Sequence, residues 1–322
     1  MKFIVTGGAG FIGHNVVRQL EALGHECFIL DSITDYGFIN NDELSYLKRE
    51  RVAQTRAGVH HIDLRNHEAV TNFFRTFSIN CDAVIHLASF PRQKAVANHP
   101  LWASDVMSTS LVHLLESTKA FRIPKFVYIS SSMIYGDFAD GVKEDAICKP
   151  QGQYGIMKLM GEQLVQDYSR RGIFNTTVIR PSAVYGERDV EDRVVSKFVL
   201  GALRGNTLLV NGATEKLDFT NVQDTAAGIV KAVVSSAANN KIYNITRSKA
   251  HSLLDAAELI VNLVGKGTIK VMDRDMNFPQ RGSLDITAAK QDLNFDPQID
   301  IEEGFARYIA WFANSEYWNS KF

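Results

Sequence analysis

The chain has 322 residues, of which 45% are hydrophobic and 22% are charged, and its formal net charge is −1 at pH 7. This composition is ordinary for globular proteins, and the length suits one large domain or a principal domain with a smaller one attached. Positive and negative side chains are balanced, without a basic excess or a polybasic run. We therefore expect neither nucleic acid nor a membrane surface as a partner.

The cysteines and the lengths of the apolar runs argue against disulfide-stabilised, metal-binding and membrane-spanning proteins. Cys27, Cys81 and Cys148 are too few and too widely spaced for a disulfide framework or a metal cluster, which suits a reducing compartment. No stretch approaches the roughly 20 apolar residues of a membrane span, and the first apolar run is too short for a signal peptide. The histidines lack metal-ligand spacing. We expect a cytoplasmic protein without a metal.

Short apolar runs alternate with longer amphipathic stretches. Strands buried on both faces of a sheet are continuous apolar segments, and six such runs predict parallel strands. They lie near residues 3–5, 27–30, 83–85, 126–129, 177–179 and 242–245. Helical patterns lie between them, for example at 14–23 and 154–171. This alternation predicts an α/β, Rossmann-type, doubly wound parallel sheet.

The alternation loosens after Arg180-Pro181, where short helical and extended patterns are mixed. We predict a Rossmann domain at residues 1–185, with a return segment at about 218–246 that rejoins the sheet. Residues 186–217 and 247–322 are expected to form a smaller, discontinuous substrate-binding lobe. The sequence has no repeats, low-complexity tracts or obvious linkers, so the two parts should pack closely.

A glycine-rich segment at residues 7–13 follows the first predicted strand and opens the first helix. Its spacing fits both G-x-x-G-x-x-G and G-x-G-x-x-G, which permit a tight turn and close approach of the backbone to a pyrophosphate. The helix N-terminus adds free N–H groups and a positive dipole end. The expected dinucleotide contacts are Gly7, Gly10, Phe11, Ile12 and Gly13.

Asp31 ends the second predicted strand, where a carboxylate would accept hydrogen bonds from an adenosine ribose. A carboxylate repels a 2′-phosphate, and residues 32–37 contain no lysine or arginine, so NAD is favoured over NADP. A turn or capping aspartate is the plain alternative. Asp63 and Leu64 could similarly flank the adenine, although a turn aspartate explains Asp63 equally well.

Tyr154 and Lys158 are four residues apart and therefore share one face of a predicted helix. A tyrosine titrates near about 10, but a neighbouring ammonium and a positive nicotinamide ring both favour the phenolate. Lys158 could also hold the nicotinamide ribose. The Y-x-x-x-K spacing is common by chance. Ser131 strengthens it, because it ends a parallel strand at the edge where ligands bind.

These motifs occur in the order of a known family, together with His86-Leu87-Ala88 and the segments at 130–136 and 180–186. The chain resembles an extended short-chain dehydrogenase/reductase of the NAD-dependent epimerase/dehydratase family, with a pattern like UDP-glucose 4-epimerase, over essentially its whole length. The resemblance implies NAD as cofactor and Ser131, Tyr154 and Lys158 as catalytic triad. Further implied cofactor contacts are Ser32, Asp63, Leu64, Leu87, Ala88 and Ser89.

The resemblance also implies the reaction: Tyr154 takes a proton from a sugar hydroxyl while NAD⁺ takes the hydride. Related 4,6-dehydratases carry an Asp-Glu pair where this chain has Ser132 and Met133, and related 3,5-epimerases and 4-keto reductases use a cysteine there. A nucleotide-diphosphate-sugar epimerase, with C4 as the expected carbon, is therefore favoured. A nucleotide-sugar dehydrogenase or dehydratase, or a non-catalytic dinucleotide-binding protein, are the alternatives.

Substrate contacts depart from the family pattern in two places. Ala183 replaces a usual asparagine, and Leu217 replaces the arginine of an Arg-Asp-aromatic triplet. Arg281 matches a second family arginine that contacts the diphosphate. The other expected substrate contacts are Ser132, Arg188 and Arg92, with solvated surface arginines as the plain alternative for the last two. Family members commonly pair through the helix near 100–119 and the Tyr154 helix, so we expect a homodimer.

Overall fold

The computed structural model describes residues 1–34, 40–90 and 93–320. Its centre is a seven-stranded sheet with the order β11-β6-β5-β4-β1-β2-β3, in which every neighbouring pair is parallel. The strands are β1 (Lys2–Thr6), β2 (Glu26–Asp31), β3 (Val59–His61), β4 (Ala83–His86), β5 (Lys125–Ile129), β6 (Asn175–Pro181) and β11 (Lys241–Ile245). The predicted α/β doubly wound fold is thus confirmed.

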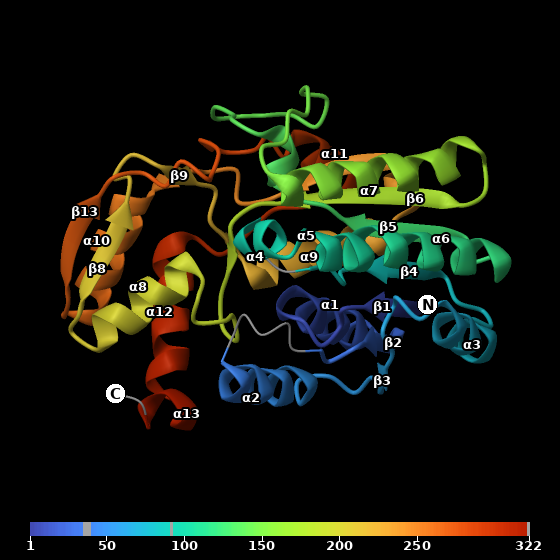
Figure 1. The fold of residues 1–322 in the computed structure, drawn as a ribbon, viewed down its shortest axis with the longest axis horizontal. Helices are drawn as coiled ribbons and strands as arrows, with labels where there is room; N and C mark the ends of the chain where they lie inside the picture. The colour runs from blue at the N-terminus through green and yellow to red at the C-terminus, as the bar shows by residue number, and fades with distance from the viewer. Residues whose placement is uncertain (35–39, 91–92, 321–322) are drawn as a thin grey trace.

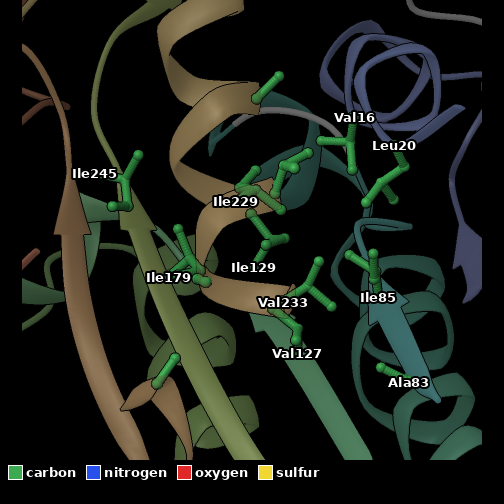
Figure 2. Close-up of a cluster of buried hydrophobic side chains, with 14 of the residues drawn as sticks. Val16, Leu20, Ala83, Ile85, Val127, Ile129, Ile179, Ile229, Val233 and Ile245 are labelled. Carbon is green, nitrogen blue, oxygen red and sulfur yellow. The ribbon is translucent and has the colours of Figure 1, made fainter. Parts of the chain in front are cut away.

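Both faces of the sheet are covered, because alternate residues of each strand enter different cores. In β5, Val127 and Ile129 belong to one apolar cluster and Phe126 and Tyr128 to the other. The first cluster is covered by α1 (Phe11–Ala22), α9 (Val222–Val234) and α11 (Thr287–Leu293). The second is covered by α3 (His67–Phe77), α6 (Ser110–Ala120) and α7 (Gln153–Arg170). Figure 2 shows the first cluster, with α1 and α9 side chains packed on the strands.

A smaller lobe lies at one side of the sheet (Figure 1). Its core joins α8 (Val194–Leu203), α10 (Leu253–Val264), α12 (Ile301–Ala313) and α13 (Glu316–Asn319) to the parallel pair β8 (Thr207–Asn211) and β13 (Thr268–Met272). Two short pairs lie near it, β7 (Val184–Tyr185) with β10 (Thr220–Asn221) and β9 (Lys216–Leu217) with β12 (His251–Ser252). One segment of the predicted lobe packs elsewhere: Leu293 of α11 joins the main-sheet core.

The remaining elements are short or peripheral. They are α2 (Asn41–Val52), α4 (Gln93–Asn98), α5 (Pro100–Ser104), the π-helix η1 (Asp105–Thr109), and the 3₁₀-helices η2 (Ser132–Tyr135) and η3 (Ser236–Ala238). Among the described residues, no helix has the length and apolar character needed to cross a membrane.

The order of the strands determines where a ligand binds. β1 pairs with β2 on one side and with β4 on the other. The chain therefore extends the sheet in one direction through β2 and β3 and in the opposite direction from β4 onward, so the strand order reverses at β1. In open parallel sheets, ligands bind in the crevice at the carboxyl ends of the strands beside such a reversal. The glycine loop follows β1, Leu87 follows β4 and Ser130 follows β5, so all three lie at this edge.

A buried ion pair joins α7 to β6. The Arg180 guanidinium donates Nε to one oxygen of Glu162 at 3.0 Å and Nη2 to the other at 2.7 Å. Both side chains are almost fully buried, with 4% and 2% of their surface exposed. The same guanidinium donates to the Tyr135 hydroxyl and the Glu144 carbonyl, so it fixes α7 relative to the loop after β5.

Glu162→Ala would leave this guanidinium buried without its counter-charge. We expect the free energy of unfolding to fall by about 3–5 kcal/mol, measured by urea denaturation. Arg307→Ala, which removes an exposed pair with Glu303 on α12, is the matched control and should cost less than about 1 kcal/mol. Equal effects of the two substitutions would contradict this assignment.

Candidate active site

The glycine loop is too tightly packed to accept side chains. Gly7 has φ +69°, and a Cβ there would lie 2.6 Å from the Ala88 backbone nitrogen. A Cβ on Gly13 would lie 2.1 Å from the Gly7 carbonyl oxygen, which accepts the Gly10 N–H at 2.9 Å. The predicted residues Gly7 to Gly13 therefore form one compact turn between β1 and α1.

The start of α1 is open to an anion. Gly10 precedes the helix without a capping side chain, and its first turn, with Phe11 and Ile12, contains no acidic residue. The first N–H groups of a helix lack intrahelical partners, so an uncapped end can bind phosphate. Because a Cβ would fill this turn and the N–H groups are uncapped, the loop fits a dinucleotide pyrophosphate.

Asp31 lies beside this loop at the end of β2. Its two carboxylate oxygens accept the N–H of Ala9 at 3.1 Å and of Ile33 at 2.9 Å. These bonds fix the carboxylate at the edge of the crevice, and each oxygen keeps a further acceptor position for a ribose hydroxyl. Ser32 follows it, and its Oγ accepts the Thr34 N–H at 3.3 Å.

Asp63 has a local partner that the sequence pattern does not reveal. Its carboxylate is bound by the Arg65 side chain, with Nη2 to Oδ2 at 2.6 Å, and it also accepts the Arg65 backbone N–H. The hydrogen bond from Arg65 lowers the pKa of Asp63. Leu64 is buried, and its carbonyl is 3.0 Å from His113 Nδ1. This geometry favours the turn alternative for Asp63, while the adenine role of both residues stays a prediction.

The segment after β4 forms the opposite wall of the loop. The N–H groups of Leu87 and Ala88 both donate to the Thr6 carbonyl at 3.1 Å. Ala88 therefore lies directly against Gly7, so close that its backbone nitrogen leaves no room for a Cβ on Gly7. Ser89 follows Ala88 in the chain. All three residues are only partly buried, so they border the crevice.

Ser131 and Tyr154 meet although they come from different elements. Ser131 follows β5, and its Oγ accepts the Met133 N–H at 3.2 Å at the start of η2. Tyr154 is in the first turn of α7, and its phenol hydrogen-bonds with the Ser131 side chain. Gly155 allows this approach, because a Cβ there would lie 2.6 Å from the Met133 carbonyl oxygen.

Lys158 lies one turn further along α7 and is buried. Its ammonium donates to the Ile129 carbonyl at 2.8 Å and lies 5.9 Å from the centre of the Tyr154 ring. Burial lowers the pKa of Lys158 to about 8. Burial raises the pKa of Tyr154, whereas the charge of Arg193 and the Ser131 hydrogen bond lower it. The structure thus brings the three predicted catalytic residues together.

Arg281 has the most distinctive environment of the predicted substrate residues. Its Nη1 lies 3.8 Å from the sulfur of Met133, two residues after Ser131, and its Nε is buried without a hydrogen-bond partner among the residues that the structure describes. Burial lowers the pKa of Arg281 to about 10. It borders a cavity of about 260 Å³ that is lined by Phe138, Ala139, Asp140, Thr214, Glu215, Lys216, Gln280 and Gly282.

The other predicted substrate residues are arranged differently. The Ser132 hydroxyl is buried and donates to the Ser182 hydroxyl at 3.0 Å. Arg188 lies against α2, where its carbonyl accepts the Arg51 guanidinium and its Nε is 3.8 Å from Glu50. The structure therefore does not bring Arg188 to the Arg281 cavity. Arg92 lies outside the described residues.

The segment around Leu217 holds the loop that carries Arg281. Leu217 is buried in the core of the smaller lobe, so it contributes no cation. The adjacent Asp218 is fully buried and accepts the N–H of Leu284 at 3.0 Å and of Lys249 at 3.4 Å. Burial raises the pKa of Asp218 to about 6. These bonds tie the segment to the chain that follows Arg281.

Comparison with known proteins matches residues 3–246 to the model of the NAD dependent epimerase/dehydratase family. The chain belongs to this family. It is 29% identical to a UDP-glucuronate 4-epimerase from Thermodesulfobacterium geofontis, over 96% of this chain and 95% of the relative. It is 27% identical to a dTDP-glucose 4,6-dehydratase from Escherichia coli, over 99% and 95% of the two chains.

The fold is also that of solved members. A UDP-glucuronic acid 4-epimerase from Bacillus cereus, in complex with UDP-glucuronic acid and NAD, superposes with a TM-score of 0.88 at 24% identity. That match covers 97% of this chain and 98% of the other. The chain is thus an NAD-dependent enzyme of the epimerase/dehydratase family, and the sequence-based predictions of family and cofactor are confirmed.

Asp31→Asn tests the cofactor assignment, because it removes the charge while keeping an acceptor. We expect the ratio of the Kd values for NADP and NAD to fall roughly 10-fold, since a charge-assisted ribose bond and a repulsion toward the 2′-phosphate are both lost. Isothermal titration calorimetry of the cofactor-free protein with each dinucleotide measures the two Kd values. Asp63→Asn should change the ratio less, because Arg65 already binds that carboxylate. An unchanged ratio in Asp31→Asn would contradict the ribose role.

Proposed function

We propose that the protein is an NAD-dependent epimerase of a nucleotide-diphosphate sugar, acting at C4. The observation that carries this proposal is the arrangement of Ser131, Tyr154 and Lys158 in one site without a carboxylic acid at positions 132 and 133. An epimerase needs a base, a device that stabilises the phenolate and a hydride acceptor, and it needs no elimination acid.

The chain's own residues perform the proton transfer. Tyr154 accepts the proton of the sugar hydroxyl. Ser131 hydrogen-bonds with the oxygen of the same hydroxyl and so orients its proton toward the Tyr154 phenolate. Lys158 supplies positive charge beneath the ring and is held in place by the Ile129 carbonyl. Asp31, the glycine loop and the segment at 87–89 would hold NAD. When bound, NAD supplies the hydride acceptor and donor that inversion of a carbinol carbon requires.

The cavity beside Arg281 suits the diphosphate. The Arg281 Nε is buried and has no hydrogen-bond partner among the described residues, which costs free energy, and a phosphate oxygen would supply the missing acceptor. Its contact with Met133 places this cation beside the catalytic segment, where the diphosphate of a sugar nucleotide would follow the sugar. Lys216 lines the same cavity and pairs with Asp140 at 3.0 Å. The named relatives act on UDP- or dTDP-linked sugars, which supports this substrate class.

The structure gives a reason to favour epimerisation over dehydration. Elimination requires a carboxylic acid at positions 132 and 133, where related dehydratases carry an Asp-Glu pair. In this chain the Ser132 hydroxyl is bound to Ser182, and Met133 is buried against Arg281. A dehydrogenase that releases its keto product uses the same base and differs only in retention of the intermediate. The homodimer stays a prediction; Val112 on α6 and Ile156 on α7 are exposed apolar side chains on the helices concerned.

Product analysis of Tyr154→Phe tests the reaction. Wild type, incubated with UDP-, GDP-, CDP- and dTDP-sugars, should convert one class into its C4 epimer, identified by NMR. Tyr154→Phe should lose at least about 100-fold in kcat, because general-base catalysis contributes about that much, while still binding NAD. Near-wild-type turnover by this variant would refute the base, and release of a free keto sugar would favour the dehydrogenase.

The pH dependence tests Lys158. Its charge favours the phenolate, so Lys158→Met should raise the pKa of Tyr154 and move the acidic limb of the kcat profile upward by about one pH unit or more. In the wild type this charge is lost as the pH rises through about 8.

Lys125→Met is the matched control for this prediction. Lys125 is also a buried lysine whose pKa is lowered to about 8, but its ammonium donates to the carbonyls of Ala232, Val233 and Ser235, away from the site. The profile of Lys125→Met should keep the wild-type acidic limb. Identical limbs in Lys158→Met and the wild type would remove Lys158 from the proton-transfer step.

A further inference from the structure

The segment between β13 and α11 leads from the smaller lobe back to the main sheet (Figure 1). We call its residues 273–279 the strap. The strap begins after Met272, whose carbonyl accepts the Gly212 N–H at 2.9 Å. It ends before Gln280, whose carbonyl accepts the Phe138 N–H at 2.9 Å. Backbone hydrogen bonds therefore fix both ends of the strap.

Two side chains from the first turn of α4 hold the middle of the strap. The Lys94 ammonium lies 3.0 Å from a carboxylate oxygen of Asp275 and 5.7 Å from the centre of the Phe278 ring. The Gln93 amide nitrogen donates to the Asn277 carbonyl at 2.5 Å. We call these three contacts the latch.

The latch is weak enough to open. Of the Lys94 side chain 66% is exposed, and exposed ion pairs contribute little free energy because water and salt screen them. The turn that the latch holds has hydrogen bonds of its own. The Phe278 N–H donates to the Asp275 carbonyl at 3.2 Å, and the Arg274 guanidinium donates to the Phe278 carbonyl at 2.8 Å. Breaking the latch leaves these bonds in place, so the middle of the strap can swing as a unit between its fixed ends.

The latch lies between the two groups that the proposed substrate has to reach. On one side, a Cβ on Gly152, two residues before Tyr154, would lie 2.8 Å from the Gln93 amide nitrogen. Ala95 of the same helix packs in the apolar cluster that Tyr154 joins. On the other side, the strap leads within two residues to Arg281. A nucleotide sugar that reaches from Tyr154 to Arg281 therefore spans the gap that the latch bridges.

We propose that the strap is the gate of the substrate site: a nucleotide sugar enters and leaves while the latch between α4 and the strap is open, and the latch then closes the strap over it. This inference rests on the proposed function. The latch contacts only protein groups, so it stabilises the closed strap by the same factor with and without the ligand. Removing it therefore accelerates association and release together and leaves Kd nearly unchanged. A side chain that binds the sugar would change Kd instead.

Stopped-flow binding to the NAD-loaded protein tests the gate, with UDP-glucose, UDP-glucuronate and dTDP-glucose as probes. In Lys94→Met, the association and dissociation rate constants should both rise about 2- to 5-fold, the factor expected for loss of an exposed ion pair. Gln93→Leu/Lys94→Met also loses the hydrogen bond to the strap and should raise both rate constants about 10-fold. In each variant the Kd should change by less than about 2-fold.

Two further variants separate the latch from general effects of charge. Lys94→Glu/Asp275→Lys exchanges the two charges and should restore both rate constants toward the wild-type values. Lys241→Met removes another exposed ion pair, in which Lys241 lies 2.8 Å from Asp292 of α11, and should keep the wild-type rate constants. Unchanged rate constants in Lys94→Met would overturn the gate. A higher Kd without faster association would mean that Lys94 binds the ligand, and this would overturn it as well.

A measurement without substrate separates this inference from the proposed function. Met133 is buried beside Arg281, so a thiol in Met133→Cys reports how often the site is open to solvent. Its rate of alkylation by iodoacetamide, followed by peptide mass spectrometry, should rise about 2- to 5-fold when Lys94→Met is added. If no probe binds, the proposed substrate class fails, and this rate alone decides the gate. An alkylation rate that Lys94→Met leaves unchanged would then overturn it.

Discussion

The hydrogen bond from the Lys158 ammonium to the Ile129 carbonyl is the contact on which the site depends. It joins the first turns of α7 to the end of β5, and therefore sets the position of Tyr154 relative to Ser131. Burying an ammonium is costly, and the single carbonyl offsets only part of that cost, so the pKa of the lysine falls to about 8. The charge still persists at neutral pH, where a phenolate needs it.

The same geometry explains why the site needs two parts of the chain. The Rossmann domain supplies Tyr154, which we propose as the base, together with Ser131 and the buried Lys158, and these groups by themselves would suit the oxidation of many alcohols. Arg281, which we propose binds the diphosphate, comes instead from the segment between β13 and α11. On the proposed function, selectivity for a substrate depends on how the segment with Arg281 is held, and Asp218 contributes by accepting the Leu284 N–H.

Much of this could be predicted from the sequence, for identifiable reasons. Six strands are continuous apolar runs because they are buried on both faces, whereas β3 is missing from that set because Val59–His61 lies at the sheet edge and is partly exposed. The glycine loop, Asp31 and the triad fall at one edge because the carboxyl ends of parallel strands meet there.

Contacts between distant segments could not be predicted in this way. The pairing of Asp63 with Arg65 depends on local side-chain geometry, and the approach of Arg281 to Met133 depends on how two distant segments pack. The same holds for α11, which the sequence places with the smaller lobe but which packs in the core of the main sheet. Spacing along the chain carries no information about such contacts.

The placement of β11 and α11 has a consequence for how the protein acquires its structure during translation. β11 closes one edge of the sheet beside β6, and Phe295 completes the apolar layer that includes Val16 of α1. A ribosome must therefore expose nearly the whole chain before the first helix is fully covered. Until then a parallel strand edge and an apolar layer face the solvent, and both kinds of surface are prone to aggregation.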